Sequence, residues 1–424
     1  MAGPSFQALP GFRDFIPREC AIRNYLFETW RSVARRCGYV EYESPVLEDT
    51  SLYLKKSGGE LSAQLFRFED QGGRDVTLRP EVTASLARLV AEHQRHFPKP
   101  LKWFEIGQCF RYEKPQKGRY RQFHQFDVEA LGFPGPDIDA ELIIMLARIW
   151  RLLRIEHVSL QINTLGTTES RVQYRTDLTA YFRAHFAGLD EDSRRRLERN
   201  PLRILDSKNP ALQALIADAP RLTGYLDGES EAHFSSLRAL LDDAGVPYVV
   251  NPRLVRGLDY YGRTVFEWVT DRLGTQGAVC AGGRYDGLVE CLGGEPTPAV
   301  GFAIGLERLV ELYALAGLGA PPRVPDVYVV AVGEAATRCA FRIAESLRDG
   351  AAPLRVETNC GGGSFKSQMK RADRSGATVA VLLGEDEVAS GTAVVKPLRT
   401  EVEQTTVATG GLADAIAAHL RSRP

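Results

Sequence analysis

The sequence lacks any cysteine or histidine pattern that would bind a metal or form a disulfide framework. Its seven cysteines include no C-x-x-C pair and no Cys/His cluster, so we expect no metal held by side-chain clusters. The odd number of cysteines suits a reducing compartment, and we expect a cytoplasmic protein. The residues after Met1 also lack the basic and apolar regions of a secretory signal.

Long apolar runs and a strong net charge are also missing. No run is long enough to span a bilayer, so we expect no membrane partner. The formal net charge of −1 gives no sign of nucleic-acid binding, so any basic groups that bind a polyanion must be local. A chain of 424 residues is expected to hold about two or three domains.

The most specific stretch is RGLDYYGRTVFEW, residues 256–268. The guanidinium of Arg256 could bind a carboxylate or a phosphate bidentately. Tyr260 and Tyr261 offer flat walls and hydroxyl groups to a small polar ligand. Residues 264–268 are strand-forming types, and a buried strand after a solvated arginine remains the alternative.

The N-terminal part predicts an amphipathic helix, a strand and a hairpin. Apolar residues recur at three- and four-residue spacing over 21–37, and a short strand follows at 39–42. Residues 65–70 and 75–79 flank a turn and predict a hairpin. A helix is expected over 83–93, where Glu81 and Thr83 could be binding groups or N-terminal residues favoured by the helix dipole.

Two longer strands, 101–112 and 122–131, are joined by a loop that contains the local basic groups. These are Lys114, Lys117, Arg119 and Arg121. One face of the second strand carries Phe123, Gln125, Asp127 and Glu129, and the other carries His124, Phe126, Val128 and Ala130. A strand of this kind is usually half-exposed, so that a solvated polar face is the alternative to a binding site.

The middle of the chain predicts a helical module between strands. A turn at 134–139, a helix at 140–153 and a strand at 158–163 precede a charged helical region over about 167–249. The arginine-rich run at 193–199 favours a solvated helix face over an RNA contact. In 279–287 the paired glycines favour either close approach to a ligand or a turn.

The remaining pattern predicts a buried strand at 299–304, a helix that begins at 305 and a linker at 318–325. Beyond the linker, strands and helices alternate, which indicates an α/β domain with a largely parallel sheet. The expected strands are 327–332, 354–357 and 378–383, and the expected helices are 334–348 and 364–373.

In this order, these motifs resemble the class II aminoacyl-tRNA synthetases, and residues 256–268 resemble the signature of the histidyl-tRNA synthetase family. Motif 1 would be the helix from 21, motif 2 the hairpin over 101–131, and motif 3 the sequence Gly305-Leu306-Glu307-Arg308. The resemblance implies an α+β catalytic domain, an antiparallel sheet with flanking helices, over 1–322. It would carry a helical insertion at about 167–249, and a C-terminal α/β anticodon-binding domain would follow over 323–424.

The resemblance also implies the reaction and its partners. ATP and L-histidine would give histidyl-adenylate, and the acyl group would pass to the 3′ end of histidine tRNA. Mg²⁺ would accompany ATP, and the protein would be a homodimer through motif 1. Catalysis would depend on positioning and on electrostatic stabilisation of the phosphate charge.

The residues that match the family's motifs have implied roles. The catalytic arginines would be Arg111 and Arg256. Histidine would be bound by Glu81, Val82, Thr83, Arg111, Gln125, Glu129, Arg256, Tyr260 and Tyr261, and ATP by Arg111, Glu113, Arg119 and Arg308. Lys114 and Gln116 would contact the tRNA acceptor end, although close bacterial relatives often have arginine where Lys114 stands.

Two rival interpretations share this fold. A non-catalytic paralogue, the regulatory subunit of the first enzyme of histidine biosynthesis, should lack the C-terminal domain and usually has a degraded form of the Arg256 signature. A synthetase for another amino acid is the second rival, and the paired tyrosines together with Glu129 argue against it. Amino-acid-dependent pyrophosphate exchange would separate all three.

Overall fold

A computed structural model describes residues 6–55, 61–116, 118–207, 209–255, 260–273, 277–320 and 324–421. The chain divides into two compact units, Met1–Ala320 and Pro321–Pro424, which are treated separately below. Arg256 and Lys117 are sequence-predicted functional residues that lie outside the described residues.

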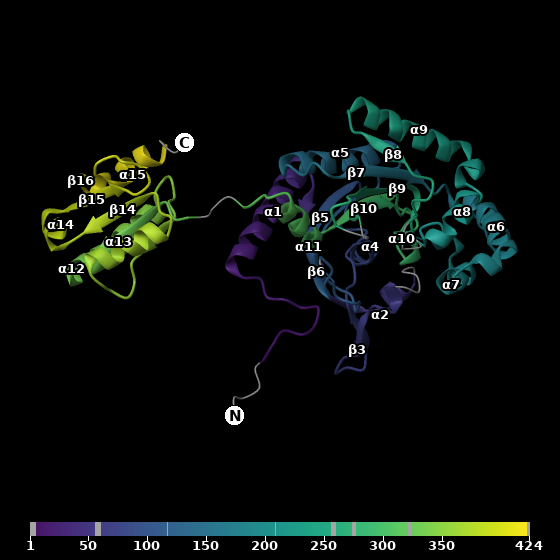
Figure 1. Cartoon of the computed structure of the whole chain (residues 1–424), viewed down its shortest axis with the longest axis horizontal. Coiled ribbons are helices and arrows are strands. Elements are labelled where there is room, and N and C mark those ends of the chain that lie inside the picture. Colours follow the sequence, from purple (N-terminus) through teal and green to yellow (C-terminus); the bar gives the residue numbers. More distant parts are fainter. Residues whose placement is uncertain are drawn as a thin grey trace. The chain divides into compact units, whose positions relative to one another are not determined.

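The first unit is built on an eight-stranded sheet with the order β1-β5-β6-β11-β10-β9-β7-β8 (Figure 1). In that order the strands are Val40–Glu41, Leu101–Phe110, Gln122–Leu131, Ala299–Gly305, Ala278–Arg284, Gly262–Val269, Ser159–Thr164 and Tyr248–Val250. The six strands from β5 to β7 pair antiparallel, whereas β1 and β8 add parallel strands at the edges. The predicted antiparallel sheet is thereby confirmed.

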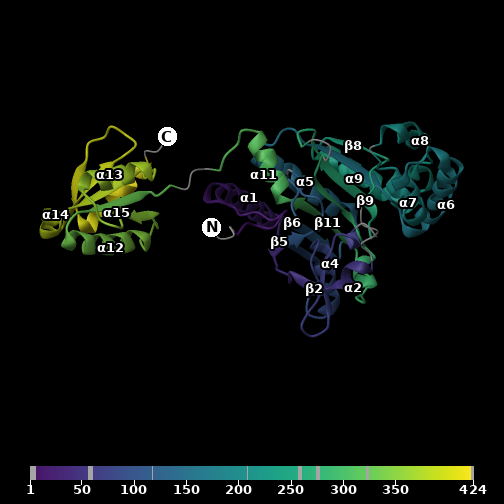
Figure 2. The same cartoon turned by 60° about the horizontal axis from the view of Figure 1, so that its bottom comes forward.

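One face of the sheet is covered by helices that carry aromatic residues into the core. The helices are α1 Pro17–Arg36, α5 Pro136–Leu152, α9 Gly228–Asp243 and α11 Leu306–Leu315, and Figure 2 shows α5 and α9 side by side. The ring of Trp30 lies 4.4 Å from that of Phe126 on β6, centroid to centroid. Trp30 is 1% exposed, so the predicted apolar face of the motif 2-like strand packs against the motif 1-like helix.

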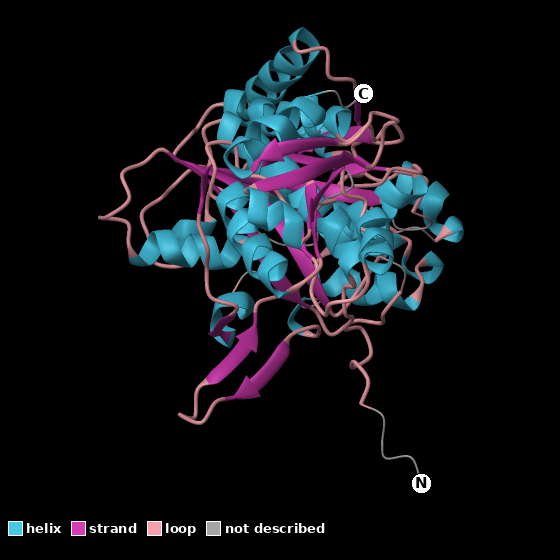
Figure 3. Ribbon diagram, turned by 90° about the vertical axis from the view of Figure 1, so that its left-hand side faces the viewer, coloured by secondary structure: helices cyan, strands magenta, loops and turns pink. Residues whose placement is uncertain are grey.

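The other face is covered by α4 and a small sheet. These elements are α2 Thr50–Leu54, α4 Thr83–Glu92 and α10 Leu288–Cys291, with strands β2 Leu47–Asp49, β4 Asp75–Leu78 and β3 Phe66–Glu69. Figure 3 shows the hairpin of β3 and β4 extending at the bottom of the view. Arg79, just after β4, forms a buried ion pair of 2.7 Å with Glu105 and donates to the Gln108 carbonyl at 2.8 Å, which fixes the hairpin to β5.

The buried side chains of the inserted module join a hydrophobic cluster that continues to α4 and to the strands of the large sheet. The module's helices are α6 Thr168–Ala184, α7 Glu191–Arg199 and α8 Gln213–Ala217, with short 3-10 turns at Phe186–Gly188, Pro201–Ile204, Pro210–Leu212 and Leu222–Tyr225. Tyr174, Phe182 and Ile204 are buried in that cluster. Arg194 and Arg195 are exposed, as expected for a solvated helix face. The helical pattern ends earlier than predicted, because residues 248–250 form strand β8 beside β7.

The second unit is an α/β domain with a five-stranded sheet, in the order β13-β12-β14-β15-β16. In that order the strands are Val356–Thr358, Val327–Ala331, Val379–Leu383, Thr392–Pro397 and Thr405–Ala408. The helices are α12 Glu334–Arg348, α13 Phe365–Arg374, α14 Glu385–Ser390 and α15 Leu412–Arg421, with a 3-10 turn at Thr409–Gly411. The first three strands are parallel, as predicted, and the last two add antiparallel pairs.

One local prediction is wrong, and one of two alternatives left open by the sequence is excluded. Helix α5 begins at Pro136, inside the predicted turn, because proline suits the first position of a helix. Gly282 and Gly283 lie within strand β10 rather than in a turn. A Cβ at Gly282 would stand 2.4 Å from the Gly301 carbonyl oxygen, so glycine here permits close packing of strands within the sheet.

Candidate active site

The polar face of β6 is buried, so the half-exposed alternative is wrong. Gln125, Asp127 and Glu129 are 9%, 1% and 1% exposed. The N-terminal turn of α4 and the segment after β10 cover them, since Thr83 and Tyr285 both donate hydrogen bonds to Glu129. A row of polar groups enclosed in this way indicates a binding site, because burying polar groups is costly unless a partner satisfies them.

Glu129 is held at both of its carboxylate oxygens. Thr83 Oγ1 donates to Oε1 at 2.7 Å, and the Tyr285 hydroxyl donates to Oε2 at 2.6 Å. Burial raises the pKa of Glu129, whereas the hydrogen bonds from Thr83 and Tyr285 favour its ionised form and oppose the rise. A Cβ at Gly301 would stand 1.4 Å from Oε2, so the opposing strand must carry glycine for this carboxylate to fit.

Glu81 and the paired tyrosines lie around the same space. Glu81 is 4% exposed and accepts from the Ala84 backbone N–H at 3.1 Å, and burial raises its pKa. The rings of Tyr260 and Tyr261 are 4.8 Å apart, and the buried Tyr260 hydroxyl has no hydrogen-bond partner among the described residues. Val82 is fully buried at the N-cap of α4, so it could face a ligand only through its backbone.

Gln125 and Arg111 lie farther along the motif 2-like hairpin. The Cys109 thiol donates to Gln125 Oε1 at 3.2 Å, which directs the amide nitrogen of Gln125 away from that contact. Arg111 Nε donates to the Pro80 carbonyl at 2.9 Å, and its guanidinium lies over the Phe123 ring at 5.2 Å. No described residue accepts a hydrogen bond from its Nη1 or Nη2, so this half of the fork suits an anion.

The cations predicted to bind ATP come together from two distant segments. Arg119 Nε pairs with Glu113 at 2.6 Å. Burial and the charge of Arg119 lower the pKa of Arg308, which lies in the first turn of the motif 3-like helix. Like charges this close repel in a buried setting, and a polyphosphate between them would relieve the repulsion.

The motif 2-like loop also carries the residues predicted to meet the tRNA acceptor end. Gln116 and Arg119 exchange backbone hydrogen bonds of 3.0 and 2.9 Å, which close a tight turn. Lys114 and Gln116 are exposed beside this turn. Their placement leaves them accessible to a large ligand.

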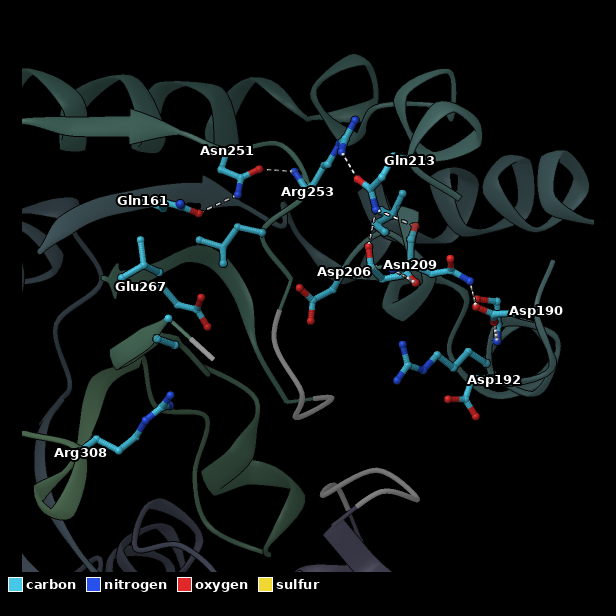
Figure 4. A pocket seen from close by; sticks show the side chains of 18 residues that line it. Gln161, Asp190, Asp192, Asp206, Asn209, Gln213, Asn251, Arg253, Glu267 and Arg308 are labelled. Atoms are coloured by element: carbon cyan, nitrogen blue, oxygen red, sulfur yellow. Dashed lines mark hydrogen bonds between the residues drawn. The ribbon is translucent and has the colours of Figure 1, made fainter. Parts of the chain in front are cut away.

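A cavity of about 970 Å³ connects the Arg308 end of the site with the inserted module (Figure 4). Glu267 and Arg308 lie on one side, and module residues such as Asp190 and Gln213 lie on the other. Arg253 Nη1 donates to Gln213 Oε1 at 3.1 Å, which ties the segment after β8 to the module. Sequence patterns did not identify this wall, since its polar residues are scattered along the chain.

A buried ionic cluster supports Tyr285, and sequence reasoning missed it. Arg284, 0% exposed, pairs with Asp139 on α5 at 2.8 Å, and His233 Nε2 on α9 lies 2.8 Å from the other oxygen of Asp139. Burial opposes ionisation of Asp139, but His233 and Arg284 outweigh it and hold the pKa of this carboxyl below its usual range. No local pattern could reveal the cluster, because its three members are far apart in the sequence.

Replacement of His233 by alanine is expected to lower the free energy of unfolding by about 1–3 kcal/mol, because Asp139 loses a buried hydrogen-bond partner. Since the pKa of Asp139 is lowered on folding, its stabilisation is present at neutral pH and is lost as the pH falls below about 4. Thermal unfolding at neutral and acidic pH measures both effects. His185→Ala, at an exposed histidine of the same unit, is the control, and equal stability of the two variants would contradict the assignment.

These features define a class. The first unit is that of a class II aminoacyl-tRNA synthetase: it has an antiparallel sheet with an enclosed polar strand, an arginine on motif 2 and an arginine on motif 3. The separate α/β unit is the remaining part of that class.

Comparisons with known proteins identify the family. The histidyl-tRNA synthetase family model matches residues 11–309, and an anticodon binding domain model matches residues 326–419. A histidine–tRNA ligase of Aromatoleum aromaticum is 52% identical over 418 residues, which are 97% of this chain and 95% of that protein. The structure of apo S. aureus histidyl-tRNA synthetase is similar, with a TM-score of 0.82 and 32% identity over 97% of this chain and 100% of that one.

The chain therefore belongs to the histidyl-tRNA synthetase family and is an aminoacyl-tRNA ligase. A structure described as an ATP phosphoribosyltransferase regulatory subunit/histidyl-tRNA synthetase, from Bacillus halodurans, covers 89% of this chain and 98% of its own, with a TM-score of 0.64 and 21% identity. That likeness shows a shared fold alone. The match of the C-terminal unit to an anticodon binding domain argues against the regulatory-subunit rival.

Proposed function

We propose that the residues around the polar face of β6 carry out the family's reaction, in which ATP activates L-histidine to histidyl-adenylate and the acyl group passes to the 3′ end of histidine tRNA. The single observation that carries this assignment is the buried Glu129, held by Thr83 and Tyr285 in a pocket walled by tyrosines. Histidine-dependent ATP–pyrophosphate exchange tests it, and Glu129→Gln should weaken the use of histidine.

In this proposal each end of histidine meets a complementary group. Glu129 and Tyr261 bind the two imidazole nitrogens, and Glu81 with Thr83 holds the ammonium group. Gln125 and Arg256 would bind the histidine carboxylate. A buried carboxylate suits both the imidazole N–H and the ammonium, because a charged acceptor strengthens each hydrogen bond.

The phosphate end is organised by arginines. Arg111 binds the α-phosphate together with Arg256, while Arg119 meets the γ-phosphate and Arg308 stacks on the adenine. The histidine carboxylate is itself the nucleophile, so the protein mainly positions the reactants and stabilises charge that develops on phosphate.

The residues present also fit Mg²⁺ bound together with ATP. The described residues contain no group of three histidine, cysteine or acidic side chains that could hold the ion alone. Mg²⁺ often uses one or two carboxylates plus substrate phosphates. Glu113, beside Arg119, would be the carboxylate that holds it, and the ion would neutralise phosphate charge.

We also propose that the protein is a cytoplasmic homodimer. No described helix is long and apolar enough to cross a membrane. Apolar side chains are exposed at Val40 on the edge strand β1 and at Val46, Leu47 and Leu54 around β2, in the segment that follows the motif 1-like helix. An exposed apolar surface of this kind favours a protein interface.

Sedimentation at micromolar concentration should therefore give the mass of a dimer. Leu47→Glu should shift the population towards monomer, because it places a charge in an apolar interface. Leu315→Glu, at another exposed leucine of the same unit, should leave the dimer intact. A monomeric wild-type protein would contradict the proposal.

The two-unit division predicts separable activities. A chain that ends at Ala320 should retain histidine-dependent pyrophosphate exchange, because the whole polar face of β6 lies in the first unit. Its charging of histidine tRNA should fall about a hundredfold or more, since a second linked binding module is lost. Both assays are run beside the full chain, and equal charging by the two proteins would contradict an anticodon role for residues 321–424.

A further inference from the structure

Asp127 is a buried carboxyl group of the site to which no role has yet been given. It stands two residues before Glu129 on the same face of β6, and both side chains are fully enclosed, at 1% exposure. Thr83 Oγ1 lies between the two carboxyl groups, 2.7 Å from Glu129 Oε1 and 3.4 Å from Asp127 Oδ1. Asp127 Oδ2 has no hydrogen-bond partner among the described residues.

The hydrogen-bond donors available to these two carboxyl groups indicate that Asp127 carries a proton. The Thr83 hydroxyl has a single proton and can donate to only one of the two carboxyl groups at a time. The shorter contact and the donation from Tyr285 both favour an ionised Glu129, whose two oxygens then accept. The contact between Thr83 and Asp127 is satisfied only if Asp127 donates, which requires a protonated carboxyl.

The charged and titratable groups that face Asp127 agree with this assignment. They are Glu129 on the same strand, Glu81 before α4, Glu105 and Cys109 on β5, and the tyrosines 42, 260 and 285. The nearby cation on this side, Arg79, is already paired with Glu105. Burial and the charge of Glu129 raise the pKa of Asp127 well above its usual range.

We propose that Asp127 is a positioning residue for histidine recognition: it keeps a proton at neutral pH and donates it to Thr83, so that Thr83 can donate to an ionised Glu129. This inference rests on the proposed role of Glu129 in binding histidine. The chain of donors would fix the carboxylate of Glu129 in the orientation that accepts the imidazole N–H. It would also prevent two negative charges from standing side by side in an enclosed pocket.

The proposal has a definite dependence on pH. Because the pKa of Asp127 is raised, its proton is present at neutral pH and is lost as the pH rises. Loss of the proton leaves Thr83 with two competing acceptors and no donor. The KM for histidine of the wild-type protein should then rise at alkaline pH.

Asp127→Asn separates this account from a simple charge role, because an amide donates a hydrogen bond at every pH. We compare the histidine KM of the wild-type protein with that of Asp127→Asn at each pH, because the ratio of the two cancels the titration of histidine itself. This ratio should be near one at pH 7 and should rise at alkaline pH. Asp127→Ala removes the donor and should raise the histidine KM about tenfold at pH 7. Asp414→Asn, at an exposed helix position in the second unit, is the matched control.

Two results would overturn the proposal. One is a tenfold or greater rise in the histidine KM of Asp127→Asn at pH 7, which would mean that an ionised Asp127 is needed. The other comes from infrared spectra, which need no enzyme activity. The proposal predicts a protonated-carboxyl C=O band that is present in the wild-type protein and lost in Asp127→Asn, and identical spectra of the two proteins in this region would contradict it. Glu129→Gln distinguishes failure of the proposed function from failure of the role given to Asp127. An unchanged histidine KM in Glu129→Gln would reject the proposed function itself, whereas a raised KM would leave only the role of Asp127 to be decided.

Discussion

Arg111→Lys is expected to lower the turnover of adenylate formation about a hundredfold, the order seen when one preorganised electrostatic donor is lost. The guanidinium donates from Nε to the Pro80 carbonyl at 2.9 Å and lies over the Phe123 ring, which leaves its two Nη groups to act as a fork. A lysine ammonium cannot make that anchor and a bidentate phosphate contact together. The histidine KM should change less, because negative charge on the phosphate grows in the transition state.

Pyrophosphate exchange over a range of histidine and ATP concentrations measures this effect. Arg67→Lys is the matched control, since Arg67 is an exposed arginine on β3 that pairs with Asp75. Near-normal turnover of Arg111→Lys would remove Arg111 from the phosphate site. Arg256→His and Arg256→Lys are expected to lose turnover in the same way, and this stays a prediction from the sequence because Arg256 lies outside the described residues.

Glu129→Gln should have the complementary effect and raise the histidine KM about tenfold to a hundredfold, the range for a hydrogen bond to a charged group. Glutamine keeps the shape but lacks the charge that accepts the imidazole N–H. Turnover should change little, because this contact is made equally in the ground state and in the transition state. The side chain at 129 already packs against the Gly301 backbone on β11, so a small shift of the glutamine in that direction cannot restore the lost contact with the imidazole.

The same exchange assay separates KM from turnover for this variant. Glu69→Gln, at an exposed position on the hairpin, is the control. A Glu129→Gln protein with normal KM but reduced turnover would show that the carboxylate acts on the reaction rather than on recognition.

The sequence predicted most elements because their patterns are local. Residues 122–131 form β6 within the predicted bounds, and 334–348 form α12 in the same way. Alternation of apolar and polar residues and a continuous amphipathic repeat each depend only on near neighbours. The observed ends of helices differ from the predicted ones where a residue suited to the helix terminus sets the boundary. Pro136 is an example, because it begins α5 inside the expected turn.

The sequence could not predict the surroundings of a residue where these are formed by segments far away in the chain. Alternation in β6 cannot reveal that Thr83 and Tyr285 enclose its polar face, so a solvated strand was an equally good interpretation. The cluster of Asp139, His233 and Arg284 joins residues 94 and 145 positions apart. The paired glycines 282 and 283 left a turn and a close approach to a ligand equally open, because the Gly301 carbonyl that requires glycine at 282 lies on another strand.

The account's central claim is that the enclosed polar face of β6 recognises the imidazole of histidine through Glu129. The most direct test measures ATP–pyrophosphate exchange by the full chain with histidine, and then with phenylalanine and glutamine, which resemble histidine in size but lack the imidazole. The account predicts exchange with histidine alone, and a histidine KM that rises at least about tenfold in Glu129→Gln. Exchange supported equally by another amino acid, or an unchanged histidine KM in the variant, would contradict it.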